Sequence, residues 1–168
     1  MKILELNKMV MGCTLCPDLC KTRNGVVSGA GSGSKLMVLG EAPGSDEDET
    51  GEPFIGRCGD LLTKMLEGTG IKRDSIYITN VVKCRPTKDN KGRSNRPPST
   101  EEVSNCKRWL WGEIKALKPK AILTLDLEYM EDTCVVPCYH PSYLMQTGKN
   151  KMDISIRCIK IAKRRAGI

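Results

Sequence analysis

Short apolar runs alternate with longer amphipathic segments along this chain, and their order predicts the fold class. Leu36 to Leu39 form a continuous apolar run, whereas residues 59–68 place Leu and Met at helical spacing. Strands that alternate with helices build a mainly parallel sheet with helices on both faces. The expected strands are 35–39, 75–82, 120–125 and 134–139, and the expected helices are 1–9, 59–68, 100–117 and 151–163.

Polar residues mark the helix ends and the loops. Ser99, followed three residues later by Glu102, is a capping box that begins the third helix. Residues 13–20 and 40–57 are interpreted as loops, and residues 85–98 as a basic loop bounded by prolines. The side chains expected to point inward are Ile3, Leu4 and Leu6 in the first helix and Ile154, Ile156, Ile159 and Ile161 in the last.

Three turns follow predicted strands, and a ligand is expected beside them. In parallel α/β sheets, ligands bind beyond the carboxyl ends of the strands. The turns in question are residues 40–54, 80–84 and 140–142.

Composition points to one domain with a basic surface. At 168 residues with 4% aromatic side chains, the chain is expected to form a single domain, 1–168, with an aliphatic core. Six of the 20 acidic residues lie between Glu41 and Glu52, so 27 basic residues face 14 acidic ones elsewhere. This excess favours a nucleic-acid partner. A lysine-rich surface that maintains solubility is the alternative.

The sequence contains no secretory leader and no run of 18 apolar residues, so no membrane partner is expected. We expect a cytoplasmic, nucleoid-associated protein. In a reducing compartment, nine cysteines do not indicate a disulfide scaffold. We therefore ask whether some of these cysteines bind a metal ion or a cluster.

Four cysteines have a pattern that suits ligation. Cys13 and Cys16 form a Cys-x-x-Cys pair, Cys84 follows the second strand, and Cys106 lies on the third helix. The pair reaches one metal centre, which needs two more ligands. Cys84 and Cys106 are equally explained as ordinary buried cysteines, and spacing does not separate zinc from a 4Fe–4S cluster. The remaining cysteines, expected to be structural, are Cys20, Cys58, Cys134, Cys138 and Cys158.

The turn after the first strand combines glycines with carboxylates. Gly40 and Gly44 let the backbone approach a ligand closely. A carboxylate beside them can orient or activate water, whereas Glu49 and Glu52 are expected in solvent. Phe54, the only phenylalanine, either stacks on a nucleobase or packs in the core.

Two later turns carry polar side chains of similar interest. His140 is the only histidine, and after the fourth strand it can donate a hydrogen bond to a developing anion. Ser142 and its neighbouring amides can hold a phosphate. Asn80 offers an acceptor and donors to the edge of a nucleobase, or else it caps the second strand.

Taken together, these residues resemble the iron–sulfur branch of the uracil-DNA glycosylase superfamily, often called family 4. The resemblance covers most of residues 13–125 and the HPS turn, in the family order. The matching segments are CTLC at 13–16, GEAPGSDEDETGEPFIGR at 40–57, YITNVVKCRP at 77–86, EEVSNCKRWL at 101–110 and YHPSYL at 139–144.

The resemblance implies a three-layer α/β/α sandwich around a four-stranded parallel sheet. It also implies specific roles for residues of the three turns. Phe54 would stack on an extruded uracil, Asn80 would read its Watson–Crick edge, and His140 would stabilise the departing anion. The other implied residues are Glu41 and Ala42 as the wall that positions water, Gly40 and Glu47 in the substrate pocket, and Cys13, Cys16, Cys84 and Cys106 as ligands of a 4Fe–4S cluster.

DNA contacts are expected from two regions. By the resemblance, Pro141 and Ser142 belong to a DNA-contacting turn, and Tyr143 or Leu144 is expected to fill the gap left by the extruded base. The loop between Cys84 and Cys106 is longer and more basic than is usual in the family. Added contacts are expected there through Arg85, Lys88, Lys91, Arg93 and Arg96. The segment 126–134 is shorter than its family counterpart, which predicts fewer contacts with DNA.

The implied activity is monofunctional hydrolysis of the N-glycosidic bond of uracil in single- or double-stranded DNA, which leaves an abasic site for base excision repair. A monomer is expected, and the compact chain suggests a virus-encoded version. Two alternatives stay open: excision of another modified or deaminated base, and a catalytically weak iron–sulfur module that binds DNA.

Overall fold

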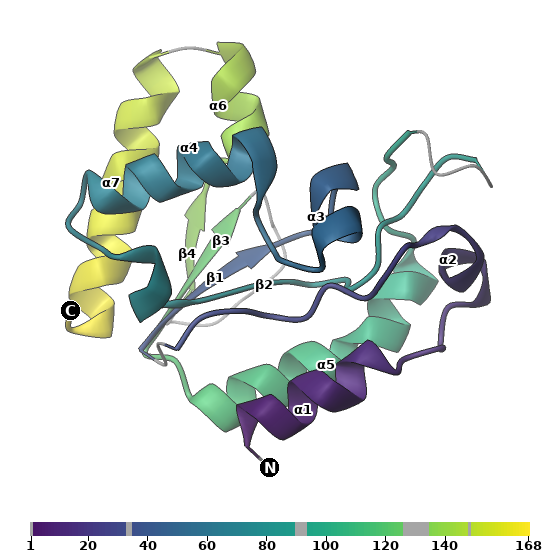
Figure 1. Ribbon diagram of the computed structural model, residues 1–168. Coiled ribbons are helices and arrows are strands. Elements are labelled where there is room, and N and C mark those ends of the chain that lie inside the picture. Colours follow the sequence, from purple (N-terminus) through teal and green to yellow (C-terminus); the bar gives the residue numbers. More distant parts are fainter. Residues whose placement is uncertain (1, 33–34, 90–93, 126–134, 148) are drawn as a thin grey trace.

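A single parallel sheet forms the centre of the molecule. The computed structural model describes residues 2–32, 35–89, 94–125, 135–147 and 149–168. Its strands are β1 (Leu36–Gly40), β2 (Tyr77–Asn80), β3 (Ala121–Leu125) and β4 (Val135–Cys138), in the order β2-β1-β3-β4. All neighbours run parallel, and helices cover both faces (Figure 1). The predicted three-layer α/β/α sandwich with four parallel strands is confirmed.

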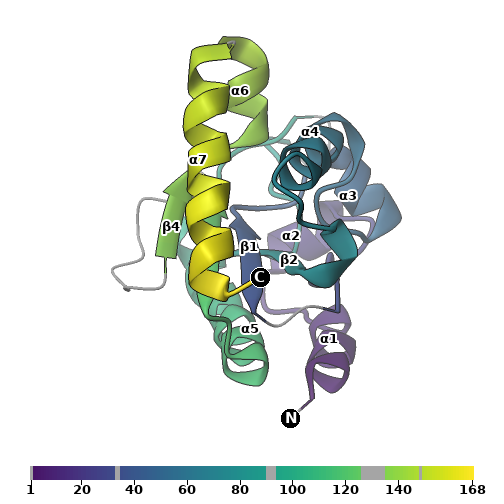
Figure 2. The same cartoon turned by 90° about the vertical axis from the view of Figure 1, so that its left-hand side faces the viewer.

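Each face of the sheet has its own helical layer. On one face, α1 (Ile3–Met11) packs against the long helix α5 (Thr100–Leu117). On the other lie α4 (Gly56–Glu67), α6 (Pro141–Thr147) and α7 (Lys149–Ala166), with α7 running along the sheet (Figure 2). All five residues of β1 are buried, as expected for a strand covered on both faces.

The capping box predicted for α5 is present. The amide of Glu102 donates to Ser99 Oγ at 3.2 Å, and the amide of Ser99 donates to Glu102 Oε2 at 2.7 Å. The amides of Ser99 and Glu102, which have no acceptor within the helix, are thus hydrogen-bonded, and the helix begins at Thr100.

Several inward-facing predictions for the terminal helices were wrong. Leu4 is 72% exposed, Ile154 45% and Ile161 36%, whereas Leu6 and Ile159 are buried. The helices at each end of the chain cover the sheet with one face only, so some apolar residues remain outside. Helix α1 also begins later than predicted, and α7 is longer at both ends.

Four short elements are not among the predicted helices and strands. They are α2 (Pro17–Thr22), α3 (Ser45–Thr50), the 3₁₀ turn η1 (Arg73–Ser75) and α6. Helix α3 forms inside the acidic stretch because Asp46, Glu47 and Asp48 lie in its first turn, where carboxylates are favoured.

The carboxyl ends of the strands meet at one edge of the sheet. Gly40 is aligned with Asn80 across β1 and β2, and β4 ends two residues before His140. Strand β2 is shorter than predicted at both ends: Ser75 belongs to η1, and the chain bends after Asn80, where the amides of Val81 and Val82 donate to the carbonyls of Gly40 and Glu41 at 2.9 and 3.0 Å. Within the described residues, no helix combines the length and apolar character needed to cross a membrane.

Candidate functional site

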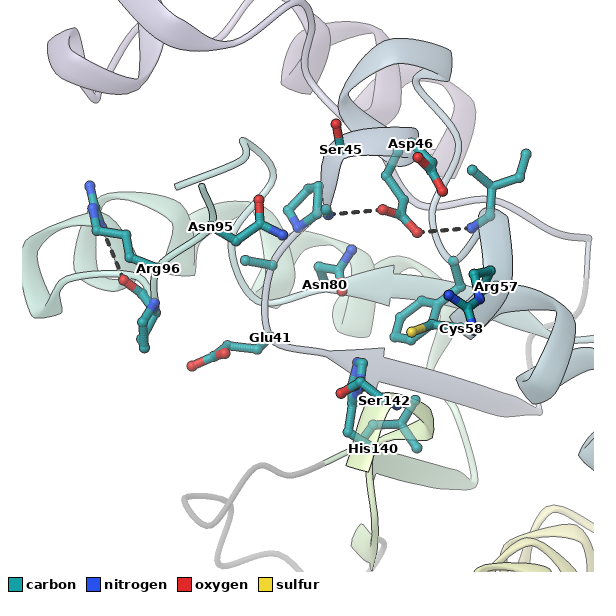
Figure 3. Close-up of a pocket in the computed structure, with 18 residues that line it drawn as sticks. Glu41, Ser45, Asp46, Arg57, Cys58, Asn80, Asn95, Arg96, His140 and Ser142 are labelled. Carbon is teal, nitrogen blue, oxygen red and sulfur yellow. Dashed lines mark hydrogen bonds between the residues drawn. The ribbon is translucent and has the colours of Figure 1, made fainter. Parts of the chain in front are cut away.

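A cavity of ≈ 580 Å³ lies where the turns after β1, β2 and β4 converge (Figure 3). The loop that precedes α5 closes one side of it. Residues predicted from the sequence to be catalytic, to bind substrate or to contact DNA lie together in its wall, although they come from distant parts of the chain. Those that line it are Glu41, Ala42, Glu47, Phe54, Asn80, Arg96, His140 and Ser142.

Asn80 lines this cavity and carries a buried acceptor without a partner. The residue is 2% exposed, and among the described side chains its Oδ1 is one of two buried polar atoms without a hydrogen-bond partner. A buried acceptor left in this state costs about 1–3 kcal/mol, so a ligand that donates to it is favoured.

Gly40 provides the space in which Asn80 and Phe54 come together. A Cβ atom on Gly40 would lie 2.5 Å from Asn80 Oδ1 and 2.6 Å from Phe54 Cε2. Only a residue without a side chain therefore fits between the amide and the ring.

Phe54 is held in a strained conformation. Its φ of 54° lies in the left-handed region, which costs a bulky residue of order 1–3 kcal/mol. The guanidinium of Arg73 donates to the Phe54 carbonyl at 2.9 Å, and the next amide, that of Ile55, donates to Glu47 Oε1 at 3.0 Å. These bonds fix the ring at the cavity, where it is 6% exposed and also part of the core. Phe54 thus packs in the core and also lines the cavity, and its stacking on a nucleobase stays a prediction.

His140 also lines the cavity and its ring contacts that of Phe54, with centroids 5.8 Å apart. The amide of Ser142 donates to His140 Nδ1 at 3.1 Å, and Ser142 Oγ lies 2.7 Å from the same nitrogen. Because Nδ1 accepts the amide hydrogen, the neutral ring carries its own proton on Nε2. The imidazole can thus act as a hydrogen-bond donor through Nε2.

The acidic residues of the turn after β1 lie in different environments. Glu47 bridges two backbone amides, since its other oxygen accepts from Gly44 at 2.9 Å, so it holds the turn that carries Phe54. Asp48 is buried and accepts from the amide and the side chain of Asn24. Glu49 and Glu52 are exposed, as predicted, whereas the exposed Glu41 lines the cavity (Figure 3).

The four cysteines singled out from the sequence also converge. Cys13 follows α1, Cys16 precedes α2, Cys84 follows β2, and Cys106 lies on α5. All four line one small cavity, although they are far apart in the sequence and come from the first loop, the end of β2 and α5. Burial raises the pKa of Cys16 and Cys84, and it raises the pKa of Cys106 to about 11.

Each of these four sulfur atoms accepts one N–H hydrogen bond. Their donors come from Arg23, from the backbone of Lys83, and from Asn105 and Trp109 on α5. The pairs are Arg23 Nη1 to Cys84 at 2.9 Å, the Lys83 amide to Cys106 at 3.2 Å, Trp109 Nε1 to Cys13 at 3.3 Å and Asn105 Nδ2 to Cys16 at 3.8 Å.

This donor set fits thiolate ligands, because hydrogen bonds to cysteine sulfurs stabilise negative charge and tune an iron–sulfur centre. No described group of three or more His, Cys, Asp or Glu residues has the arrangement expected for a single metal ion.

Comparison with known proteins identifies the family. A model described as the uracil DNA glycosylase superfamily matches residues 28–159. The chain belongs to this superfamily. A type-4 uracil-DNA glycosylase of Thermotoga maritima is 35% identical over 175 residues, which cover 90% of this chain and 88% of that protein.

Two archaeal relatives have higher identity over shorter regions. Type-4 uracil-DNA glycosylases of Archaeoglobus fulgidus and Pyrobaculum aerophilum are 43% and 44% identical over 122 and 129 residues. These alignments cover 72% and 76% of this chain, and 58% and 62% of the two relatives. The resemblance drawn from the motifs, to the type-4 branch of the superfamily, is thereby confirmed.

The basic residues that were predicted to contact DNA differ in their exposure to solvent. Arg96 lines the cavity and pairs with Glu102 at 2.6 Å, which holds the pKa of Glu102 below its usual range. Arg85, predicted to contact DNA, is instead buried, and its Nε donates to Asn95 Oδ1 at 2.7 Å. Lys88 is exposed, whereas the predictions for Lys91 and Arg93, like those for residues 126–134, fall outside the described residues.

Tyr143 and Leu144, which the sequence analysis gave the same predicted role, lie in different environments. Leu144, on α6, is buried in the core, so of the two residues predicted to fill a gap in the DNA stack only Tyr143 stays a candidate. Tyr143 is half-buried, and its hydroxyl accepts a hydrogen bond from Lys151 of α7. Pro141 is buried at the start of α6.

Sequence reasoning missed the residues that support the cysteines. Asn105 and Trp109 lie four residues apart on α5, so helical spacing places them on one face, and Trp109 comes three residues after Cys106. That signal was present in the sequence. For Arg23 no local signal exists, because its bond to Cys84 spans 61 residues. Cys58, expected to be structural, lines the cavity, and burial raises the pKa of its thiol.

Proposed function

We propose that this chain is a monofunctional uracil-DNA glycosylase that hydrolyses the N-glycosidic bond of uracil in DNA and leaves an abasic site. The observation that carries the proposal is the unpartnered Oδ1 of Asn80 at the wall of the cavity. Uracil has an N3–H donor beside an O4 acceptor, which matches the oxygen and the NH₂ group of an amide. Cytosine lacks the N3–H donor, so Asn80 would discriminate between the two bases.

The remaining cavity residues suit an extruded base. An enzyme that acts on a base within a duplex must first take it out of the stack, at a cost of a few kcal/mol. Phe54, fixed by Arg73 and Glu47, would offer its ring for stacking on the pyrimidine. Gly40 would let the base approach the backbone of β1.

His140 would act on the leaving group. Bond cleavage places negative charge on the uracil and positive character on the sugar. The Nε2 proton of His140, fixed by the Ser142 bonds to Nδ1, is a suitable donor to that anion. Glu41 would orient the attacking water, and DNA phosphates together with nearby carboxylates favour the sugar cation.

We further propose that Cys13, Cys16, Cys84 and Cys106 hold a 4Fe–4S cluster. The support is the donor set: four cysteines around one cavity, each sulfur with an N–H donor. Such a cluster would tie the cysteine loop to β2 and α5. Iron and zinc analysis of purified protein, with the visible absorbance, distinguishes the two centres. Zinc in a colourless protein would contradict the proposal.

DNA contact is proposed for the rim of the cavity, through Arg96, Ser142 and Tyr143. Arg85 is not part of this proposal because it is buried, and the contact through Arg93 stays a prediction that lies outside the described residues. We also propose that the protein acts as a monomer.

The test is release of base from defined oligonucleotides by anaerobically purified protein. Uracil should be removed from single- and double-stranded DNA, and alkali should then cleave the strand at the abasic site. Cytosine and thymine substrates serve as controls, together with the His140→Ala variant. Release of a different deaminated base, or DNA binding without any abasic sites, would contradict the assignment to uracil excision.

A further inference from the structure

A buried ion pair lies behind the cavity wall. Lys83 and Glu113 are 1% and 0% exposed, and Lys83 Nζ lies 2.7 Å from Glu113 Oε2. Buried lysines and glutamates are rare unless paired, and a pair of this kind is weak evidence for stability on its own. We therefore ask whether the Lys83–Glu113 pair holds a neighbouring residue in place.

All three hydrogens of the Lys83 ammonium group are used. Besides Glu113, Nζ donates to Thr79 Oγ1 at 2.6 Å and to the backbone carbonyl of Asn80 at 2.7 Å. That carbonyl ends β2, where the chain leaves the sheet. The Lys83 side chain thus donates a hydrogen bond to the last carbonyl of β2, that of Asn80, and holds the backbone there.

Glu113 is equally saturated. Its Oε1 accepts from Tyr77 at 3.1 Å, and both its oxygens lie within 3.2 Å of Thr79 Oγ1. Every bond of the carboxylate therefore goes to β2 or to Lys83. The network fixes this strand from the α5 side of the sheet.

We propose that Lys83 and Glu113 are positioning residues, which hold Asn80 so that its amide faces the cavity. The inference rests on the proposed function of Asn80 in base recognition. The Asn80 side chain itself has no partner on Oδ1, so its own hydrogen bonds do not fix that atom. Its direction must come from the backbone, which Lys83 and the aligned Gly40 hold on either side.

Lys83 also touches the cysteine centre, but through a different group. Its amide donates to Cys106, whereas its side chain reaches Asn80. Side-chain variants therefore leave the sulfur contact in place. The visible absorbance of the purified protein then reports whether the cysteine centre is intact.

The test is a double-mutant cycle between the ion pair and Asn80. The variant Lys83→Met/Glu113→Gln removes both charges together and keeps an acceptor for Tyr77, so no unpaired buried charge remains. We expect kcat/KM for uracil to fall about 10- to 100-fold, as is common when supporting residues are lost. Added to Asn80→Ala, the same change should lower kcat/KM no more than about twofold further, because its effect passes through Asn80.

Lys163→Met is the matched control. Lys163 Nζ also donates to a backbone carbonyl, that of Thr69 at 2.8 Å, but near the opposite edge of the sheet. It should leave kcat/KM unchanged. Glu113→Asp keeps a negative charge beside Lys83, so no buried charge is left unpaired, but its shorter side chain draws the carboxylate away from the Lys83 ammonium. It should lower kcat/KM about 10-fold and provides a second test if the paired variant does not fold.

The outcomes separate the two proposals. If wild-type protein releases no uracil, the proposed function fails and this inference fails with it. If wild-type protein is active but the losses of the two changes multiply, or Glu113→Asp keeps wild-type kcat/KM, only the positioning role is overturned. Wild-type kcat/KM in the paired variant would overturn it as well.

Discussion

Gly40→Ala tests the geometry of the cavity most directly. The added Cβ would lie 2.5 Å from Asn80 Oδ1 and 2.6 Å from Phe54 Cε2, so each group must retreat by about 1 Å to reach ordinary contact. Neither has free room, because Phe54 is held by Arg73 and the backbone of Asn80 is held by Lys83. A shift of this size at a reacting centre costs about 100-fold in rate.

A 100-fold loss in kcat/KM corresponds to about 2.7 kcal/mol of transition-state stabilisation. Overpacking should also lower the free energy of unfolding by about 1–3 kcal/mol. Steady-state release of uracil from an oligonucleotide measures the first quantity, and denaturant unfolding the second. Gly25→Ala is the control, since its Cβ would meet nothing closer than 4.0 Å. If Gly40→Ala keeps kcat/KM within threefold of wild type, the close approach of Asn80 and Phe54 has no functional meaning.

Four further results are expected. His140→Ala should lower kcat about 100- to 1000-fold while Kd for DNA stays within threefold; equal losses in both would remove His140 from the chemical step. Asn80→Ala should weaken the preference for uracil over cytosine, measured as a ratio of kcat/KM, and an unchanged ratio would contradict base reading. Cys84→Ser should abolish the visible absorbance and lower Tm, whereas retained colour would remove Cys84 from the ligand set. Glu102→Gln should lower the free energy of unfolding by about 1 kcal/mol at pH 7. Because Arg96 depresses the pKa of Glu102, that difference is present above the ordinary value of 4.5, and it should vanish as pH falls through the pKa in the folded state; a difference that persists in acid would contradict the pairing.

Local patterns in the sequence were sufficient for the layers and for several ends of elements. The apolar run of β1 and the Ser99 capping box depend on neighbouring residues alone, so their prediction needed no tertiary information. The inner face of a helix depends instead on the surface against which it docks. For that reason Leu4 and Ile161 were wrongly placed, although their helices were found.

The sequence by itself determined which residues carry the chemistry: the cysteine pair, the glycine and acid-rich turn, and the lone histidine all stand out by type and spacing. Only the tertiary structure decided what those residues can do. The left-handed backbone of Phe54, the unpartnered oxygen of Asn80 and the burial of Lys83 against Glu113 each depend on contacts between distant segments. Such contacts set the conformation and solvation of a side chain, and neither quantity is encoded by its immediate neighbours in the chain.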